Sequence, residues 1–296
     1  MAGHVADRLQ IESFYDPATS TFSHLLLDAA SGDCALVDTV LDFDPKSGRT
    51  GRESADRLIA RVKALGARLV WLLETHVHAD HLSAAAYIQQ QLGGQIAIGQ
   101  HITTVQATFG RLFNVGPEFK RDGSQFDRLL AEGEVITLGT TPLRVMHTPG
   151  HTPACTTYVA GEGDQTVAFI GDTLFRPDYG SARCDFPGGD ASTLYRSVRR
   201  LLSLPPSTRL YFCHDYPEAG QAPSVSSTVA AQREGNIHLH DGIAEEAFVA
   251  MRRARDAGLA MPVLILPSVQ VNMRAGHLPP PEDNGVSYLK LPLDAL

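Results

Sequence analysis

Residues 76–81 read H-V-H-A-D-H, so three histidines and one aspartate fall within six consecutive positions. The apolar run 69–73 comes directly before this segment, and residues 82–92, rich in Ala and Gln, follow it. This pattern predicts a buried strand, a tight loop and then a helix. α/β proteins commonly place their functional sites in strand-to-helix loops. We therefore expect a fold in which this loop lies at the end of a buried strand and carries a functional site.

Three further candidate donors stand alone later in the chain, each after an apolar run. They are His151 in T-P-G-H-T-P, Asp172 in F-I-G-D-T and His214 in F-C-H-D-Y. A His or Asp at the end of a buried strand is held rigidly, as the short and directional bonds to a metal require. A lone His such as His214 is more often an ordinary hydrogen-bonded residue, but the ordered combination indicates a metal site. The candidate donors are His76, His78, Asp80, His81, His151, Asp172 and His214.

The remaining pattern is that of one mixed α/β unit. Residues 31–33 read S-G-D and predict a hairpin turn between antiparallel strands. We expect strands at 9–15, 22–27, 34–40, 69–73, 95–98, 135–138, 143–147, 156–159, 167–170 and 210–213. We expect helices at 55–65, 82–92, 191–202, 225–232 and 245–257.

Charge and composition narrow the class of partner. The 296 residues carry a formal net charge of −8 without a cluster of Lys or Arg, which argues against nucleic acid and anionic membranes as partners. Neither an export signal nor a membrane span is visible. The four separate cysteines indicate neither a disulfide framework nor a structural zinc site. We therefore expect a soluble, cytoplasmic protein that acts on small molecules.

Taken in order, T-H-x-H-x-D-H, T-P-G-H-T-P, G-D-T and H-D resemble the metal signature of the metallo-β-lactamase superfamily. The resemblance implies an α/β fold, the αβ/βα four-layer sandwich, with two mixed β-sheets flanked by helices. It further implies a single domain over residues 1–296. In that domain, residues 215–296 would form a short C-terminal extension that helps to close the substrate pocket.

Two later elements resemble one branch of that superfamily. Residues 183–186 read R-C-D-F and residues 272–274 read N-M-R, as in the persulfide dioxygenases of the ethylmalonic encephalopathy protein family, bacterial type. Glyoxalase II relatives carry a lysine- and tyrosine-bearing element after the metal aspartate instead. The P-D-Y-G-S-A segment at 177–182 departs from the shorter turn of the better-known dioxygenases.

The resemblance implies an oxidoreductase with one Fe(2+) per chain, bound by His76, His151 and Asp172 as the catalytic residues. Two imidazoles and one carboxylate leave positions open for a substrate sulfur and for O2. The expected partners are glutathione persulfide and O2, with sulfite and glutathione as products, and a homodimer is expected. The other donors, His78, Asp80, His81 and His214, would orient the ligands and bound water.

Arg183 and Arg274 are the candidates for binding the carboxylates of glutathione, because a planar guanidinium makes two parallel hydrogen bonds to a carboxylate. Tyr216 and Asn272 could add neutral hydrogen bonds. The alternative for Arg183 is an ion pair with Asp185, and for Arg274 the capping of a helix or turn.

Two other functions remain open from the sequence. A dinuclear-zinc, glyoxalase II-like thioester hydrolase would bind two Zn(2+). His76, His78 and His151 would then hold one ion and Asp80, His81 and His214 the other, with Asp172 bridging. A non-catalytic metal-bound persulfide sensor is the third reading.

Overall fold

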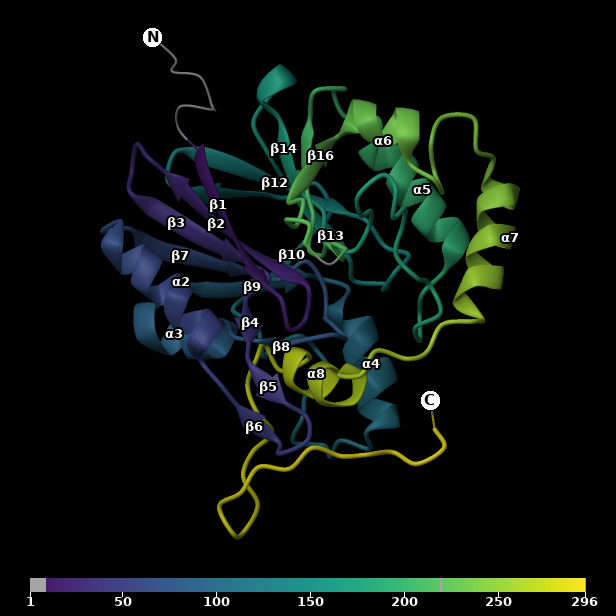
Figure 1. Cartoon of the computed structure of the whole chain (residues 1–296). Coiled ribbons are helices and arrows are strands. Elements are labelled where there is room, and N and C mark those ends of the chain that lie inside the picture. The colour runs from purple at the N-terminus through teal and green to yellow at the C-terminus, as the bar shows by residue number, and fades with distance from the viewer. Residues whose placement is uncertain (1–8, 219, 296) are drawn as a thin grey trace.

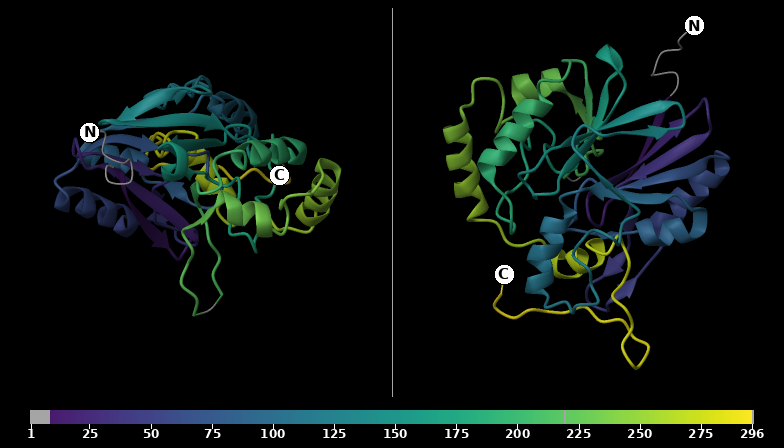
Figure 2. Two further views of the ribbon diagram at one scale, coloured as in Figure 1. Left: turned by 90° about the horizontal axis from the view of Figure 1, so that it is seen from above. Right: turned by 180° about the vertical axis from the view of Figure 1, so that it is seen from behind.

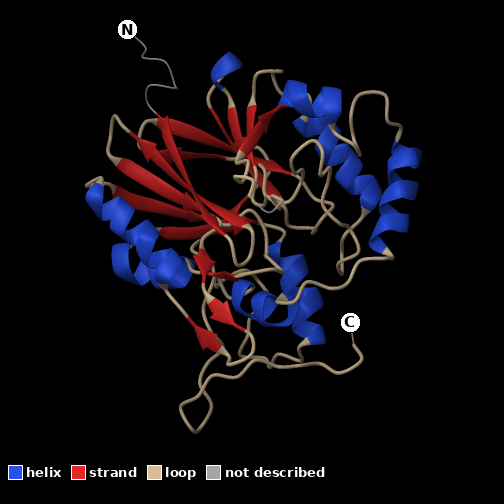
Figure 3. Ribbon diagram, in the orientation of Figure 1, coloured by secondary structure: helices blue, strands red, loops and turns tan. Residues whose placement is uncertain are grey.

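Two six-stranded sheets lie face to face with helices on their outer sides (Figures 1 and 3). The computed structural model describes residues 9–218 and 220–295. The first sheet has the spatial order β1 (Leu9–Asp16), β2 (Thr21–Asp28), β3 (Asp33–Val37), β7 (Arg68–Leu73), β9 (Gln95–Gly99) and β10 (Arg128–Leu130). Its first two pairings are antiparallel and the rest are parallel, so the sheet is mixed.

The second sheet is mixed as well. Its order is β11 (Val135–Leu138), β12 (Thr141–His147), β13 (Thr156–Ala160), β14 (Val167–Phe169), β15 (Arg209–Tyr211) and β16 (Ser226–Thr228). Only β14 and β15 are parallel neighbours. Two small ribbons, β4 (Val40–Leu41) with β8 (Leu82–Ser83) and β5 (Phe43–Asp44) with β6 (Arg49–Thr50), lie beside the first sheet.

Alternation along the strands explains the layers. On β2, Leu26 faces the core between the sheets, whereas Leu25 and Leu27 face the outer helices. On β13, Tyr158 faces the same central core and Val159 the opposite helical layer. Because successive side chains of a strand point to opposite faces, strands that are apolar on both faces must be covered on both sides.

The helices supply that cover. The first sheet packs on α2 (Glu53–Ala64), α3 (Ala85–Leu92), α4 (Ile102–Leu112) and α8 (Ile265–Asn272). The second packs on α5 (Ala191–Leu201) and α6 (Val229–Gly235), and α7 (Glu245–Asp256) lies against α5 (Figure 2). A short 3-10 turn spans Gly163–Gln165. The predicted four-layer sandwich with two mixed sheets is thus confirmed.

Some local predictions are wrong. The helix predicted at 225–232 is instead strand β16 followed by α6, because Ser226–Thr228 pairs with β15. The helix predicted from Leu82 begins only at Ala85, since Leu82 and Ser83 pair with β4. The sequence reading also missed α4 and α8. The apolar stripe of α4, Ile102, Val105 and Phe109, has helical spacing, whereas α8 is buried on most sides and shows little periodicity.

One edge of the sandwich collects the loops that carry the candidate donors. β7, β14 and β15 each end there, as does β12, which runs antiparallel to β13. The two sheets are joined at this edge by the backbone bond from Phe22 N to Cys213 O, 2.7 Å. Among the described residues, no helix is both long and apolar enough to cross a bilayer.

Candidate metal centre

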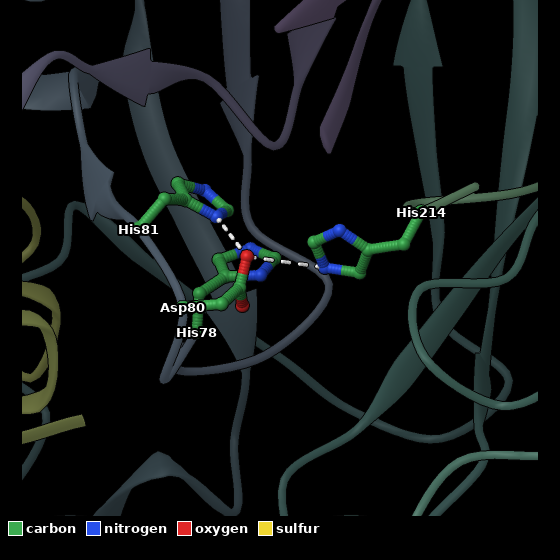
Figure 4. A group of neighbouring side chains, drawn as sticks. All are labelled: His78, Asp80, His81 and His214. Atoms are coloured by element: carbon green, nitrogen blue, oxygen red, sulfur yellow. Dashed lines mark hydrogen bonds and ion pairs between the residues drawn. The ribbon is translucent and has the colours of Figure 1, made fainter. Parts of the chain in front are cut away.

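Four loops from both sheets bring the seven predicted donors to one place. Residues 76–81 follow β7 of the first sheet, while His151, Asp172 and His214 follow β12, β14 and β15 of the second. Figure 4 shows His81 and His214 on opposite sides of Asp80, each directed toward its carboxylate. The site therefore depends on correct stacking of the two sheets, and the structure brings together all seven residues that the sequence singled out.

His76, His151 and Asp172 form the first group of donors. His76 Nε2 lies 3.9 Å and His151 Nε2 3.7 Å from Asp172 Oδ2. These separations are longer than a hydrogen bond, so the three side chains face one another without hydrogen bonding to one another. Two imidazole nitrogens and one carboxylate oxygen thus surround a common point.

His78, Asp80, His81 and His214 form the second group. Asp80 Oδ2 lies 3.1 Å from His81 Nδ1 and 3.3 Å from His214 Nε2 (Figure 4). His214 Nε2 also lies 3.4 Å from Asp172 Oδ1, which connects the two groups. Unlike the first group, the second contains a hydrogen bond between its own members, from His81 to Asp80.

Buried nitrogen and oxygen atoms without a hydrogen-bond partner indicate whether this cluster is suited to a metal. The atoms without a hydrogen-bond partner include His76 Nε2, His78 Nδ1, His81 Nε2, Asp172 Oδ1 and His214 Nε2. Buried polar atoms of this kind are rare, because desolvation without a partner is costly. All are common metal ligand atoms and all are directed into the same site, so the residues fit a metal centre.

Hydrogen bonds on the far side of two rings fix which nitrogen faces the site. His76 Nδ1 lies 3.0 Å from Thr75 Oγ1, whose hydroxyl donates to Asp38. His151 Nδ1 donates to the backbone carbonyl of Arg183 over 2.8 Å. Each bond assigns the proton to Nδ1 and leaves Nε2 as a free lone pair, which is how metal-binding imidazoles are usually held.

His78 is held in the opposite sense. Its Nε2 lies 3.0 Å from Asp38 Oδ1 and 3.4 Å from Glu74 Oε2, so Nδ1 is the atom that faces the donors. Burial alone would lower the pKa of His78, but the two carboxylates raise it well above its usual value. Asp38 and Glu74 thus orient His78 through charge-assisted hydrogen bonds.

Electrostatics differ between the two groups. Burial, and then the neighbouring imidazoles, lower the pKa of His76 well below its usual value, so His76 is neutral and able to bind a cation. Burial also lowers the pKa of His214, but Asp172 and Asp80 outweigh it and raise that pKa to about 9. A metal at the second group would have to displace the His214 proton, because metal binding requires a neutral imidazole.

A cavity of about 270 Å³ reaches the first group, two of whose members, His151 and Asp172, line it. Asp80, Arg183 and Tyr216 line it as well, and the last two were expected near a substrate. The Arg183 guanidinium is nevertheless bound by both oxygens of Asp185, each at 2.6 Å. The ion pair that the sequence left as the alternative for Arg183 is thus the arrangement present.

The structure places Asn272 and Arg274 away from this cavity. Asn272 is buried; its Nδ2 donates to the carbonyls of His78 and His81, and its Oδ1 accepts from Ser83 N at 2.7 Å. Both polar atoms of the Asn272 amide are therefore used by residues 78–83, which leaves neither for the expected contact with substrate. Arg274 stacks on Phe119 and donates to the carbonyl of Gln270 in α8. This agrees with the alternative role, the capping of a helix or turn.

Sequence reasoning missed Asp38, Glu74 and Arg255. Asp38 ends a buried strand and has a φ of 52°, and Glu74 ends the strand before the histidines, so an acidic residue closing a buried run was the available signal. Arg255 lines the cavity from α7, but nothing in its sequence neighbourhood distinguishes it from Arg252 and Arg253.

The layered fold and the clustered donors define a metal-binding protein of the α/β sandwich type. Residues 18–214 match the family described as Metallo-beta-lactamase superfamily, and the chain belongs to this superfamily.

Several relatives match nearly the whole chain. A probable metallo-hydrolase of Burkholderia pseudomallei is 65% identical over 97% of this chain and 100% of its own. Glyoxylase B2 of Dictyostelium discoideum is 44% identical over 99% of both chains. The mitochondrial persulfide dioxygenase ETHE1 of Mus musculus is 32% identical over 92% of this chain and 90% of its own. The crystal structure of ETHE1 from Myxococcus xanthus has a TM-score of 0.71 and 27% identity, covering 90% of this chain and 100% of that chain.

Proposed function

We propose that this chain is an iron-dependent persulfide dioxygenase that oxidises glutathione persulfide with O2 to sulfite and glutathione. The observation that carries the proposal is the first donor group, in which two imidazole nitrogens and one carboxylate oxygen surround a common point beside a cavity. That ligand set, with open positions, is the one typical of non-haem Fe(II) oxygenases. Relatives named persulfide dioxygenase support the same assignment.

Bound Fe(II) would supply the electrons that O2 activation requires and open positions for a sulfur anion and O2. The protein's own residues do the rest. His76 and His151 present Nε2 because Thr75 and the Arg183 carbonyl hold Nδ1. Asp172 contributes the negative charge of the ligand set, and its Oδ1 is directed toward His214.

Both elements that distinguish the dioxygenase resemblance contact the ligand loops. The R-C-D-F element orients His151 through the Arg183 carbonyl, and Phe186 packs edge-on against the His151 ring at 5.1 Å between centroids. The N-M-R element holds the loop of residues 76–81 through Asn272. Support of this kind around ligands preserves their geometry. These contacts connect the two elements to the metal site itself.

The second group holds its own charge balance in the metal-free protein. Asp80 shares its Oδ2 between His81 and His214, and the pKa of His214 is raised to about 9. In the metal-free protein a protonated His214 balances part of the charge of the two carboxylates, so a second cation would compete with that proton. His214 Nε2 lies 3.4 Å from Asp172 Oδ1, so a protonated His214 would place its charge beside the carboxylate of the first group.

A dinuclear hydrolase is the alternative, and one observation favours it. The atoms His78 Nδ1, His81 Nε2 and His214 Nε2 are buried without partners, so a second metal would satisfy them. Relatives of higher identity are named metallo-hydrolase and glyoxylase. A hydrolase would use such a pair of metals to activate water against a thioester.

Parallel assays of two metal forms separate the proposals. Metal-free protein is loaded anaerobically with Fe(II) or with Zn(II), and each form is assayed with glutathione persulfide for O2 uptake and with S-lactoylglutathione for hydrolysis. We expect O2 uptake by the iron form alone and little thioester hydrolysis by either. Hydrolysis by the zinc form, with no O2 uptake by the iron form, would overturn the proposal in favour of the hydrolase.

A further inference from the structure

Three arginines line the cavity over the metal site, but two of them are neutralised by neighbouring carboxylates. Arg183 makes two bonds of 2.6 Å to Asp185. Arg252, which is 1% exposed, pairs with Asp256 at 2.6 Å. A guanidinium whose charge and donors are used in this way has little left for a ligand.

Arg255 is the exception. It lines the same cavity from the last turn of α7, and its side chain is exposed. Among residues 9–218 and 220–295, no carboxylate pairs with it and no hydrogen bond uses its guanidinium. A cationic group in a cavity wall that has five donors and no partner is suited to an anionic ligand.

Aromatic rings connect the metal site to this arginine. The Tyr216 ring stacks on His214, with centroids 6.0 Å apart, and Tyr179 stacks on Tyr216 at 4.9 Å. Tyr179 and Arg255 line the same cavity, so the row of rings leads from the metal site into the cavity that Arg255 faces. Within the described part of the chain, neither tyrosine hydroxyl forms a hydrogen bond, so both can serve a ligand.

Buried contacts fix α7 relative to the metal ligands. Arg252 donates to the carbonyl of Ser181, and Asp256 accepts from the backbone N–H of Cys184 at 2.9 Å. Ser181 and Cys184 lie in the segment between the donor Asp172 and α5. Since these anchors stand on either side of Arg255 in the helix, its backbone is held at a set distance from the site.

We propose that Arg255, with the hydroxyl of Tyr179, binds a carboxylate of the thiol carrier, and so selects carboxylate-bearing substrates over neutral ones. The sulfur end lies at the metal, the carrier extends along the tyrosine rings, and its carboxylate meets Arg255. The identity of the reacting sulfur rests on the proposed function. The carboxylate requirement applies equally to a glutathione thioester.

Direct binding of glutathione tests this subsite without turnover. Calorimetry under anaerobic conditions is run on the iron-loaded protein, on Arg255→Gln and on the control Arg253→Gln, whose arginine is exposed on the same helix but does not line the cavity. We expect the Kd for glutathione to rise about tenfold in Arg255→Gln, the usual scale for a charge-assisted contact, and to stay unchanged in the control. Arg255→Lys should restore part of the affinity.

A second experiment removes the carboxylates from the ligand instead of the arginine from the protein. The diethyl ester of glutathione, which has no free carboxylate, should bind the unaltered protein about as weakly as glutathione binds Arg255→Gln. It should bind both proteins equally. The subsite is refuted if Arg255→Gln binds glutathione as tightly as the unaltered protein, if Arg253→Gln loses as much affinity, or if the unaltered protein does not bind glutathione.

Kinetics separate failure of this inference from failure of the proposed function. With glutathione persulfide, Arg255→Gln should raise KM about tenfold and leave kcat nearly unchanged, because the carboxylate contact is made in substrate and transition state alike. If the iron-loaded protein consumes no O2, the dioxygenase proposal fails while the binding assay still decides the subsite. If O2 uptake proceeds with an unchanged KM in Arg255→Gln, the subsite fails and the dioxygenase stands.

Discussion

His151 donates from Nδ1 to the backbone carbonyl of Arg183 over 2.8 Å. The arginine of the R-C-D-F element therefore acts on the metal site through its backbone, while its guanidinium is bound to Asp185 and to the carbonyl of Ala260. The ion pair fixes the loop that supplies the carbonyl. In this way a partly buried charge pair and the buried His151 ring are coupled through one residue.

Replacing Asp185 should weaken metal binding without removing any ligand. In Asp185→Asn the bidentate pair with Arg183 is lost, and the carbonyl that orients His151 becomes less fixed. We expect about tenfold lower Fe(II) affinity, the lower end for a lost supporting contact, measured by competition with a chelator. Asp178→Asn is the matched control because Asp178 pairs with Arg176 at the same spacing and neither side chain bonds to one of the seven donors. Equal affinities in both variants would contradict this coupling.

Asn272 should be a major determinant of stability. Asn272→Ala leaves the carbonyls of His78 and His81 and the N–H of Ser83 without partners in a buried setting. Each such loss costs about 1–3 kcal/mol, and water entering the space would recover part, so we expect a drop of about 3 kcal/mol in the free energy of unfolding. Urea denaturation of the metal-free protein measures it. The exposed Asn284→Ala should change little, and a stable Asn272→Ala would refute the assignment.

His24 should make stability fall in mild acid. Burial lowers its pKa from 6.5 to about 4, against the hydrogen bond to Phe212 O. In the unfolded chain His24 is therefore protonated below about pH 6.5, whereas in the native chain it stays neutral down to about pH 4. The free energy of unfolding consequently decreases as the pH falls through this window. Between pH 7 and pH 5 the loss is about 2 kcal/mol.

The variant His24→Gln isolates this effect. Its free energy of unfolding, measured in urea at pH 7 and at pH 5, should decline by about 2 kcal/mol less than that of the unaltered protein. Other groups titrate in both proteins and cancel in the comparison. Parallel declines would contradict a neutral, buried His24.

Single substitutions in the two donor groups should have different consequences. His76→Ala removes a nitrogen of the first group and should abolish Fe(II) binding, whereas His81→Ala should retain one Fe(II) per chain with reduced activity. The reason is that His81 acts through Asp80, to which it is hydrogen bonded. Metal analysis after gel filtration measures the stoichiometry. Loss of all iron from His81→Ala would indicate that the second group binds the metal directly.

Local sequence patterns were sufficient for the candidate donors and for most strands, whereas the four-layer arrangement was predicted from the resemblance to the metallo-β-lactamase superfamily. Apolar runs ending in His or Asp identify strand ends, and the ordered combination of these motifs predicted that His76 and Asp172 share a metal site. α8 was missed because burial on most sides removes the periodicity on which helix prediction depends.

Contacts between distant segments could not be predicted in the same way. Asn272 lies far along the chain from His78, and only folding shows that its amide is used by the metal loop. Likewise nothing in the sequence distinguishes Arg252 from Arg255, and the R-C-D-F element left open whether Arg183 is paired. Whether a guanidinium is free or paired depends on which carboxylate the fold brings near, and Asp185 and Asp256 decide that for two of the three.

The most direct test is to titrate metal-free protein anaerobically with Fe(II) and then record O2 uptake and sulfite formation with glutathione persulfide. A mononuclear centre of His76, His151 and Asp172 predicts activity that rises linearly to one Fe(II) per chain and then stays constant, with one O2 consumed per sulfite formed. An absence of O2 uptake at full iron loading, or activity that appears only as a second metal binds, would contradict it.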